Sequence, residues 1–440
     1  MFWNRIIDRK SLGNRLFGSV FYKFVSGTVG YAVAHKPYSL EAIQAKTLRK
    51  TRDNESRDNE LSQENELGFL EKLSLMMTKK LNEQVNNYSQ QGKYQQAIPF
   101  AGRALVIREK LLGDEHPLVA KSLNTMAELY RQMGEYVRAE PRYRRALYLW
   151  KKTLGEEHPS FATSLNNLAS LYVSTGEYAR AKPRYRQALE IRRKTLGEEH
   201  PDVAVSLNNL AELYRRMGEY VCAEPLYRRA LDIWQTALGE EHPLVATSLN
   251  NLASLYVSMG DYVRAEPLYR RALDLWKKTL GEEHPDFAKS LNNLAWLYCK
   301  MGEYVRAEPL LKRALDILKT TLGEEHPDFA KRLNNLAWLY HQMGEYARAE
   351  PLYRRALDIQ KNILGEEHPE VVVSLNNLVE LYRLMGESAR ADSLFKRALD
   401  IRKKTLEDEG LHYSFLDNLE RAFQTRSSGQ FFVMERPLRA

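Results

Sequence analysis

Apolar side chains along most of this chain recur at the spacing of an amphipathic helix. In residues 201–217, Leu207, Leu210, Ala211 and Tyr214 lie at intervals of three, four and seven positions, which puts them on one face of a helix. A second run with the same spacing starts a few residues later. The pattern predicts two helices whose apolar faces pack against each other across a short turn.

This helix pair repeats with a period of 42 residues. The histidines of His-Pro pairs stand at positions 116, 158, 200, 242, 284, 326 and 368, and glycines recur at the same interval from 92 to 386. An unbroken period of this length is typical of stacked units, each of which buries its apolar face against its neighbours. Eight such units are expected over residues 74–409, so the predicted fold is an all-α solenoid.

Residues at the ends of each predicted helix favour the same boundaries. Pro201 suits the first turn of a helix, where its missing N–H costs nothing. The Glu-Glu-His triplet before it places acidic groups and a turn-closing imidazole at that N-terminus. Gly218 can adopt the left-handed conformation that ends a helix, and Gly239 is a second stop. Pro225 lies inside the second helix and removes one backbone hydrogen bond, so a slight kink is expected there.

The arrangement Leu-x2-Leu-Ala-x2-Tyr at 207–214, followed by Ala223-x3-Tyr227, resembles the tetratricopeptide repeat. The 42-residue form, LGEEHPDVAVSLNNLAELYRRMGEY from Leu196 to Tyr220, is similar to the repeats of kinesin light chains and their bacterial relatives. The resemblance implies a right-handed superhelix whose inner groove, lined by the first helix of each unit, holds extended peptide segments of partners. The N-terminal region lacks the sustained apolar heptads needed to grip a motor heavy chain, so a motor role is not expected.

The N-terminal segments share no period with the repeats. Residues 1–49 form a basic arm, and its apolar stretch 16–34 has the outline of a secretory signal or membrane anchor. Lys23 opposes that interpretation, because it costs about 2.5–3.5 kcal/mol on membrane insertion. The alternative is a basic leader that contacts acidic surfaces weakly. Residues 50–66 are almost wholly polar and predict a linker.

The C-terminal end bears on self-assembly. An apolar stripe within residues 410–426 predicts a helix that covers the last repeat, and residues 427–440 form a tail. An uncapped repeat array can stack end to end, which would make the chain a structural self-assembly module. A capped end disfavours that alternative, so a monomer is expected.

Composition agrees with a soluble globular array, since 44% of the residues are apolar and 28% are charged. The net charge of +8 is concentrated at the N-terminus, where residues 1–50 hold nine basic and two acidic side chains. The other 390 residues carry 56 basic and 55 acidic side chains. The repeats therefore lack the excess positive charge that binding to nucleic acid phosphates requires.

The sequence holds no recognised motif for catalysis or cofactor binding: no Walker loop, dinucleotide-binding glycine motif, zinc-protease motif or nucleophile elbow occurs in it. Each Glu-Glu-His triplet supplies too few donors for a metal ion, because equivalent loops of stacked units lie on the order of 10 Å apart. Cys222 and Cys299 stand too far apart for a disulfide and favour a reducing, cytoplasmic compartment. We expect no enzyme activity, cofactor or metal.

Two adjacent asparagines recur on the polar side of the first helix in six of the eight units, although asparagine lowers helix stability. The first, as at Asn208, lies at the flank of the apolar stripe and is expected to tie neighbouring units together. The second lies further round, where its carboxamide can donate to and accept from the backbone of any extended peptide. By resemblance, it also matches a groove position of kinesin light chain repeats. Ligand contact is favoured over an inter-unit ladder for Asn167, Asn209, Asn251, Asn293, Asn335 and Asn377.

Selectivity is expected from groove positions that differ between units. Some units carry Glu with Arg, others Ser with Val, and the sixth and seventh carry Trp. A tryptophan opposite the apolar stripe could anchor an apolar or aromatic side chain flanked by acidic residues. The alternative is that each indole packs against an adjacent helix with only an edge exposed. The candidate groove residues besides the asparagines are Glu212, Arg215, Arg216, Lys289, Lys331, Trp296, Trp338 and His341.

Three other tryptophans, Trp150, Trp234 and Trp276, stand late in the second helices and are expected in the core. Together these features favour a non-catalytic adaptor that holds an extended segment of a partner protein in its groove. Two alternatives stay open, a self-assembly module and an exported or membrane-tethered adaptor attached through residues 16–34.

Overall fold

The computed structural model describes residues 59–408. The predicted arm (1–49), the C-terminal capping helix (410–426) and the tail (427–440) lie outside the described residues. The chain divides into two compact units, Met1–Gly68 and Phe69–Ala440, and the repeats lie in the second.

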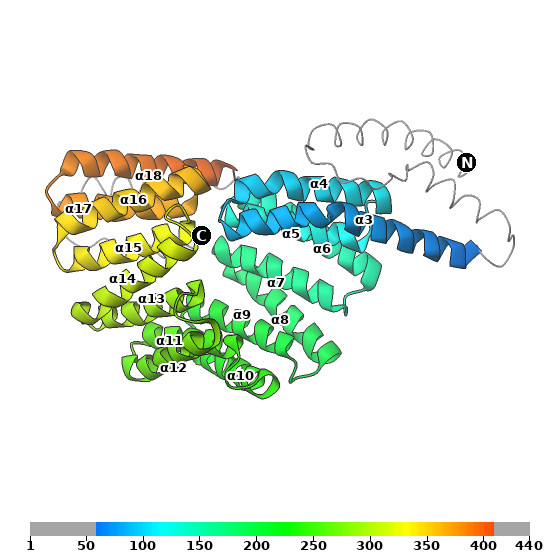
Figure 1. Ribbon diagram of the computed structural model, residues 1–440, viewed down its shortest axis with the longest axis horizontal. Coiled ribbons are helices and arrows are strands. Elements are labelled where there is room, and N and C mark those ends of the chain that lie inside the picture. Colours follow the sequence, from blue (N-terminus) through cyan, green and yellow to red (C-terminus); the bar gives the residue numbers. More distant parts are fainter. Residues whose placement is uncertain (1–58, 409–440) are drawn as a thin grey trace, which may run out of the picture. The chain divides into compact units, whose positions relative to one another are not determined.

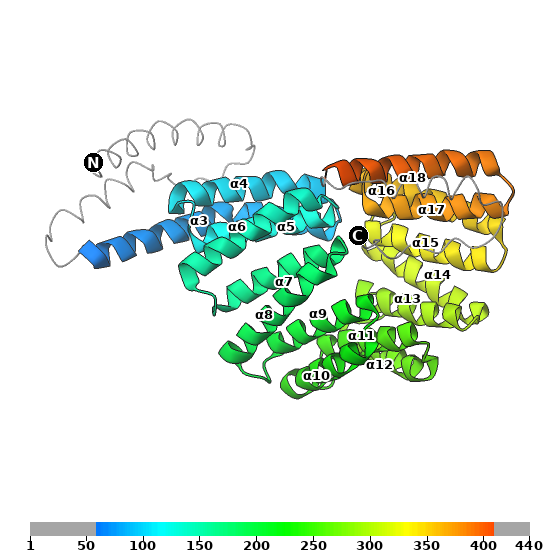
Figure 2. The same cartoon turned by 180° about the vertical axis from the view of Figure 1, so that it is seen from behind.

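Sixteen helices and no strand make up the described residues, and they follow one another as helix–turn–helix pairs (Figures 1 and 2). Each of the eight pairs forms one unit, and from α4 onward the helix starts recur every 42 residues. The first helix of each unit, here called the A helix, is α3 (Asn59–Gln90), α5 (Pro117–Gln132), α7 (Pro159–Ser174), α9 (Pro201–Met217), α11 (Pro243–Met259), α13 (Pro285–Lys300), α15 (Pro327–Gln342) or α17 (Pro369–Leu384). The second, the B helix, is α4 (Tyr94–Leu112), α6 (Tyr136–Leu154), α8 (Tyr178–Leu196), α10 (Tyr220–Leu238), α12 (Tyr262–Leu280), α14 (Tyr304–Thr321), α16 (Tyr346–Leu364) or α18 (Ser388–Asp408).

The start of the first repeat differs from the prediction. Helix α3 begins at Asn59, so the end of the segment 50–66, which was expected to be a linker, is helical. The physical reason is compositional, because residues 59–66 are rich in Glu, Gln and Leu, which are good helix formers. A polar composition alone does not distinguish a linker from a helix.

The His-Pro period encodes a helix cap. Nδ1 of His200 accepts a hydrogen bond from the backbone N–H of Asp202 at 3.1 Å, and Pro201 is the first residue of α9. The same cap begins every A helix from α5 to α17. The imidazole satisfies one of the free N–H groups at the helix start, as Ser or Asp does in most proteins.

The predicted helix ends are also present. Gly218 has φ 77° and ψ 10°, a left-handed conformation that ends α9, and Gly239 ends α10 with φ 91°. Helix α10 runs through Pro225 without a break, although that residue supplies no N–H. An internal proline is therefore tolerated here without ending the helix.

A continuous apolar core runs through the stack. The stripe predicted for α9 is buried, since Leu207 and Ala211 are 0% exposed. Ala223 and Ala230 of α10 are equally buried and let the paired backbones approach closely. Buried tryptophans fill the space between units, as predicted for Trp150, Trp234 and Trp276, which are 8%, 2% and 6% exposed.

The A helices lie on the inner side of the curved array. Successive A helices such as α9 and α11, or α11 and α13, contact each other directly, whereas no successive B helices in the described residues do so to the same extent. On a curved stack, elements crowd together on the concave face and spread on the convex face. The A helices therefore line the groove, and the B helices carry outward-facing residues such as Val263, which is 87% exposed.

None of the helices within residues 59–408 combines the length and the apolar character that crossing a lipid bilayer requires. The apolar stretch 16–34 lies outside the described residues.

Candidate functional site

In four of the described units, the asparagine at the first of the two positions ties its unit to the next. Nδ2 of Asn124 donates to Oγ of Ser164 in the next unit at 2.7 Å, and Nδ2 of Asn334 donates to Oγ of Ser374 at the same distance. The equivalent Asn166 and Asn250 also bond to the serine 40 residues further along. This ladder is the structural role predicted for the first asparagine.

The second asparagine of each pair is half-buried and lies closer to the groove surface. In two units it donates to the first asparagine of the preceding unit, from Asn251 to Asn208 at 2.8 Å and from Asn335 to Asn292 at 2.7 Å. In both, the carboxamide oxygen still has lone pairs available to accept. The side chains of four of the series make no hydrogen bond to the described part of the chain, namely those of Asn167, Asn209, Asn293 and Asn377.

In the second to fifth units, one groove position on the A helix lies over a tyrosine of the paired B helix. In the second unit the Tyr143 hydroxyl donates to the Glu128 carboxylate at 2.7 Å, and in the fourth Tyr227 donates to Glu212 at 2.9 Å. The third and fifth units have a serine at this position, such as Ser170, whose hydroxyl bonds to the tyrosine. The residue at this position therefore sets the polarity of the groove floor, unit by unit.

The glutamate at this position is neutralised by its neighbours. The Arg215 guanidinium makes a bidentate ion pair with the Glu212 carboxylate, with both hydrogen bonds 2.8 Å long. Arg216 donates a third hydrogen bond to the same carboxylate at 2.8 Å. Burial alone would raise the pKa of Glu212, but the hydrogen bonds and charges of the two arginines outweigh it and lower that pKa. Arg215 also donates to Ser258 in the next unit at 3.1 Å. These three predicted groove residues form one internally paired cluster.

Tryptophan replaces the glutamate or serine in the sixth and seventh units. The rings of Trp296 and Trp338 pack together with their centroids 4.9 Å apart and inclined by 49°. Both indoles are half-buried, so each packs on the other and still presents part of its ring. The ammonium of Lys300 lies over the Trp296 ring, 4.5 Å from its centroid. The pair forms an apolar surface beside one cation.

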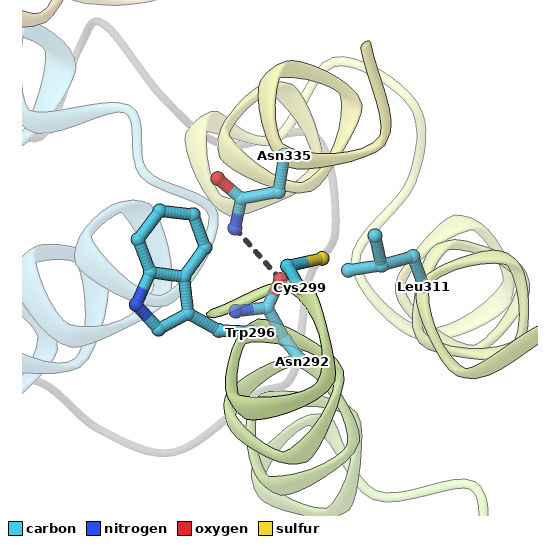
Figure 3. A pocket seen from close by; sticks show the side chains of 5 residues that line it. All are labelled: Asn292, Trp296, Cys299, Leu311 and Asn335. Atoms are coloured by element: carbon cyan, nitrogen blue, oxygen red, sulfur yellow. Dashed lines mark hydrogen bonds between the residues drawn. The ribbon is translucent and has the colours of Figure 1, made fainter. Parts of the chain in front are cut away.

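A small hollow lies beside this pair, between α13, α14 and α15 (Figure 3). The hollow is small, with room for no more than about one water molecule. The B helix of this unit carries Leu311 where the second to fifth units and the seventh have a tyrosine, so no hydroxyl-bearing ring fills the space. Burial raises the pKa of the Cys299 thiol in the wall to about 11, so this thiol is protonated at neutral pH. The hollow is lined by Asn292, Trp296, Cys299, Leu311 and Asn335.

Comparison with known protein families gives the same repeat. The family model described as tetratricopeptide repeat matches seven overlapping segments, residues 77–151, 119–194, 160–236, 202–278, 245–320, 286–362 and 328–404. The chain belongs to the tetratricopeptide repeat family. No curated protein matches it.

Several solved structures are similar to this chain. A putative kinesin light chain from Podosopora anserina with nearly identical repeats is 31% identical, covers 47% of this chain and 98% of its own, and has a TM-score of 0.40. BtubC (BKLC) from P. vanneervenii is 28% identical and covers 55% of this chain and 92% of its own, with a TM-score of 0.42. The apo form of RapI is 18% identical, covers 65% and 98%, and has a TM-score of 0.49.

Three residues predicted to line the groove of this repeat array lie elsewhere or are already paired. His341 is 6% exposed, because its ring packs edge-on against Tyr346 and Tyr353 beneath the surface. Lys289 bonds to Asp286 on its own helix at 2.9 Å. Lys331 pairs with Glu370 of α17 at 3.5 Å. The cation that meets the tryptophan pair is instead Lys300, four positions after Trp296 on the same helix face, a spacing that the sequence alone displays.

Metal binding finds no support in the described residues, since no three His, Cys, Asp or Glu side chains gather there in a geometry that could hold an ion. The Glu-Glu-His acids pair instead with basic groups of nearby helices. Glu241, for example, pairs with Lys278 at 3.5 Å, and Glu282 accepts from Lys277 at 2.5 Å.

The tyrosine layer provides a stability test. Replacing Tyr227 with phenylalanine is expected to lower the free energy of unfolding by about 1.5 kcal/mol, because the half-buried Glu212 loses a hydrogen-bond donor. Tyr353 is the matched control, since its buried hydroxyl has no hydrogen-bond partner among the described residues. Its replacement by phenylalanine is expected to change stability by less than about 0.5 kcal/mol or to raise it. Urea unfolding followed by circular dichroism measures both, and equal losses would contradict the assignment.

Proposed function

We propose that this chain is a non-catalytic adaptor that binds an extended segment of a partner protein along its A helices. The observation that carries the proposal is the Trp296–Trp338 pair. Aromatic side chains of this size are normally buried fully in a repeat core, as Trp234 is, yet these two stay half-exposed on the inner face. Partly exposed tryptophans beside a hollow are the residues that most often dominate the binding energy of a protein interface.

The second asparagines supply contacts that do not depend on sequence. Their carboxamides recur once per unit along the groove, and an extended peptide presents a backbone N–H and C=O at a regular spacing. Each carboxamide offers a donor and an acceptor for those groups. Such contacts hold a segment of any sequence in an extended conformation and leave selection to the residues between them.

The selecting residues differ along the array. In the second and fourth units the groove glutamates are neutralised by arginines, so these units present a paired and nearly neutral floor. The sixth and seventh units present the indole pair, the hollow and Lys300. This combination suits a partner segment with an apolar or aromatic side chain near an acidic residue.

A binding experiment tests the proposal. Random peptides displayed on phage are selected against the full chain, and the tightest selected peptide is titrated by calorimetry against the wild type, the double variant Asn293→Ala with Asn335→Ala, and Val263→Ala. The asparagine variant is expected to bind several different selected peptides more weakly by about the same factor, because contacts to backbone carry little sequence information. Val263 lies on the convex face and its replacement is expected to change nothing. Loss of binding only in Val263→Ala would place the ligand on the wrong face.

Charge at Lys300 is expected to select among peptides. Lys300→Glu should weaken peptides with an acidic residue beside the apolar anchor by about tenfold, or 1.4 kcal/mol, and spare neutral ones. The salt dependence of binding should shrink in the same variant. Lys278→Glu, on the outer helix α12, is the matched control and should leave both peptide classes unaffected. Equal weakening of acidic and neutral peptides by Lys300→Glu would show that this lysine does not read ligand charge.

A further inference from the structure

Two of the capping histidines make a contact that the others in the described residues do not. Besides capping α15, His326 places its Nε2 3.2 Å from the backbone carbonyl oxygen of Gln90, which is 236 residues away. His368, which caps α17, places its Nε2 3.1 Å from the carbonyl oxygen of Gln132, again 236 residues away. The two contacts are related by the 42-residue period, so the array curves back until the A–B turns of its first two units meet the starts of α15 and α17.

Glycine is required in both turns because the approach is so close. A Cβ atom added to Gly92 would lie 2.5 Å from Cδ of Pro327, and one added to Gly134 would lie 2.5 Å from Cδ of Pro369. At the equivalent turns of the fourth and fifth units, Gly218 and Gly260 have the same left-handed backbone, but an added Cβ would meet nothing within 4 Å. In every unit the glycine allows the left-handed turn, but in the first two units it also allows the close approach of a proline.

The hydrogen-bond pattern fixes the state of both imidazoles. Nδ1 accepts a backbone N–H and Nε2 faces a carbonyl oxygen, which only a neutral ring protonated on Nε2 can satisfy. Burial lowers the pKa of both histidines. The charged groups that face His326 are Asp328 on its own helix, Lys331 and Lys289, and those that face His368 are Glu370 and Lys331. From the opposing turns come the two carbonyl oxygens, and the Tyr94 hydroxyl near Asp328.

We infer that these two contacts, His326 with the Gln90–Gly92 turn and His368 with the Gln132–Gly134 turn, form a latch that holds the array at its present curvature and that acid opens. Protonation of either ring removes the Nδ1 acceptor from the helix cap. It also places the positive charge of the imidazolium in a contact that is largely shielded from water. The open state binds more protons than the latched state, so the latch is fully favoured above a pH of about 6.5 and is lost as the pH falls below it. Opening alters the spacing of the A helices, which couples the latch to any ligand that lies across them.

Small-angle X-ray scattering of the full chain tests the latch. The double variant His326→Asn with His368→Asn keeps an effective N-cap, since asparagine is among the best capping residues, but loses both Nε2 contacts. It is expected to have a larger radius of gyration than the wild type at pH 8, and acid should not increase that radius further. The wild type should expand between pH 7.5 and 5.5 with its helical circular dichroism unchanged. The matched control is His200→Asn with His242→Asn, whose caps have no distant partner in the described residues, and it should behave as the wild type does.

Two double glycine variants distinguish the effect of opening the latch from the effect of backbone strain alone. Gly92→Ala with Gly134→Ala introduces a clash with both prolines, whereas Gly218→Ala with Gly260→Ala introduces only the strain of a left-handed alanine. The first pair should expand the chain at pH 8 and the second should not. The inference is overturned if the histidine pair has the wild-type radius at pH 8, or if both glycine pairs expand the chain equally.

Discussion

Replacing Trp234 with alanine is expected to lower the free energy of unfolding by about 3–5 kcal/mol, the largest effect of a single substitution in the repeats. The indole is 2% exposed in α10 and belongs to the continuous core between units, so its removal leaves a cavity that neighbouring side chains fill only in part. Urea unfolding followed by circular dichroism measures the loss. Because most contacts in the repeats are made between neighbouring units, a separate early transition of the central units is also expected.

The control for Trp234 lies on the same helix. Val221 is 85% exposed in the first turn of α10, and its replacement by alanine is expected to change stability by less than about 0.5 kcal/mol. A loss below about 1 kcal/mol for Trp234→Ala would show that the core is loosely packed at this position and would contradict the burial described above.

The double variant Trp296→Ala with Trp338→Ala is expected to weaken a selected groove peptide at least 30-fold, or about 2 kcal/mol, because truncation of anchoring aromatic residues carries this cost. Stability should fall less than in Trp234→Ala. The two rings are half-buried, and their mutual packing contributes about 0.5–1.5 kcal/mol beyond the area they bury. Calorimetric titration and urea unfolding of the same samples separate the two effects.

Two outcomes would oppose the role of the tryptophan pair. If the double variant unfolds as readily as Trp234→Ala, the indoles are core residues. If it is stable and binds the peptide with unchanged affinity, the hollow beside Trp296 takes no part in recognition. In either case the second asparagines would remain as inter-unit ties, as the bonds from Asn251 and Asn335 already show in two units.

The helix boundaries could be predicted because short-range chemistry determines them. A His-Pro pair caps each A helix from α5 to α17 through an imidazole and a proline that are adjacent in sequence, and glycine ends it through its own backbone freedom. The role of the first asparagine could also be predicted, since its angle on the helix lets it reach the serine of the next unit. Each of these features depends on one helix or on two neighbouring ones.

The misplaced groove residues show the limit of an angle on a helix. His341 stands on the polar side by angle, but its ring turns under the surface to pack against Tyr346 and Tyr353. Lys300 lies over Trp296 because its side chain is long enough to reach back one turn. An angle gives the direction of Cβ and not the end point of a long side chain.

The contacts across the array lay beyond prediction for a different reason. Whether His326 meets Gln90 depends on the small rotation between units, summed over five repeats. No local sequence motif determines that total rotation. The same His-Pro sequence at His200 has no such partner in the described residues. The contacts of the first two units with the starts of α15 and α17 therefore could not be predicted from the sequence.

Photo-crosslinking tests most directly whether the concave face holds an extended peptide. Benzoylphenylalanine is placed either at Gln342, an exposed groove position at the end of α15 one turn after Trp338, or at Val263 on the convex face of α12. The tightest phage-selected peptide is irradiated with each protein, and the products are mapped by mass spectrometry. The account predicts a crosslink from position 342, abolished by excess unlabelled peptide, and none from position 263. A competed crosslink from position 263, or none from position 342, would contradict it.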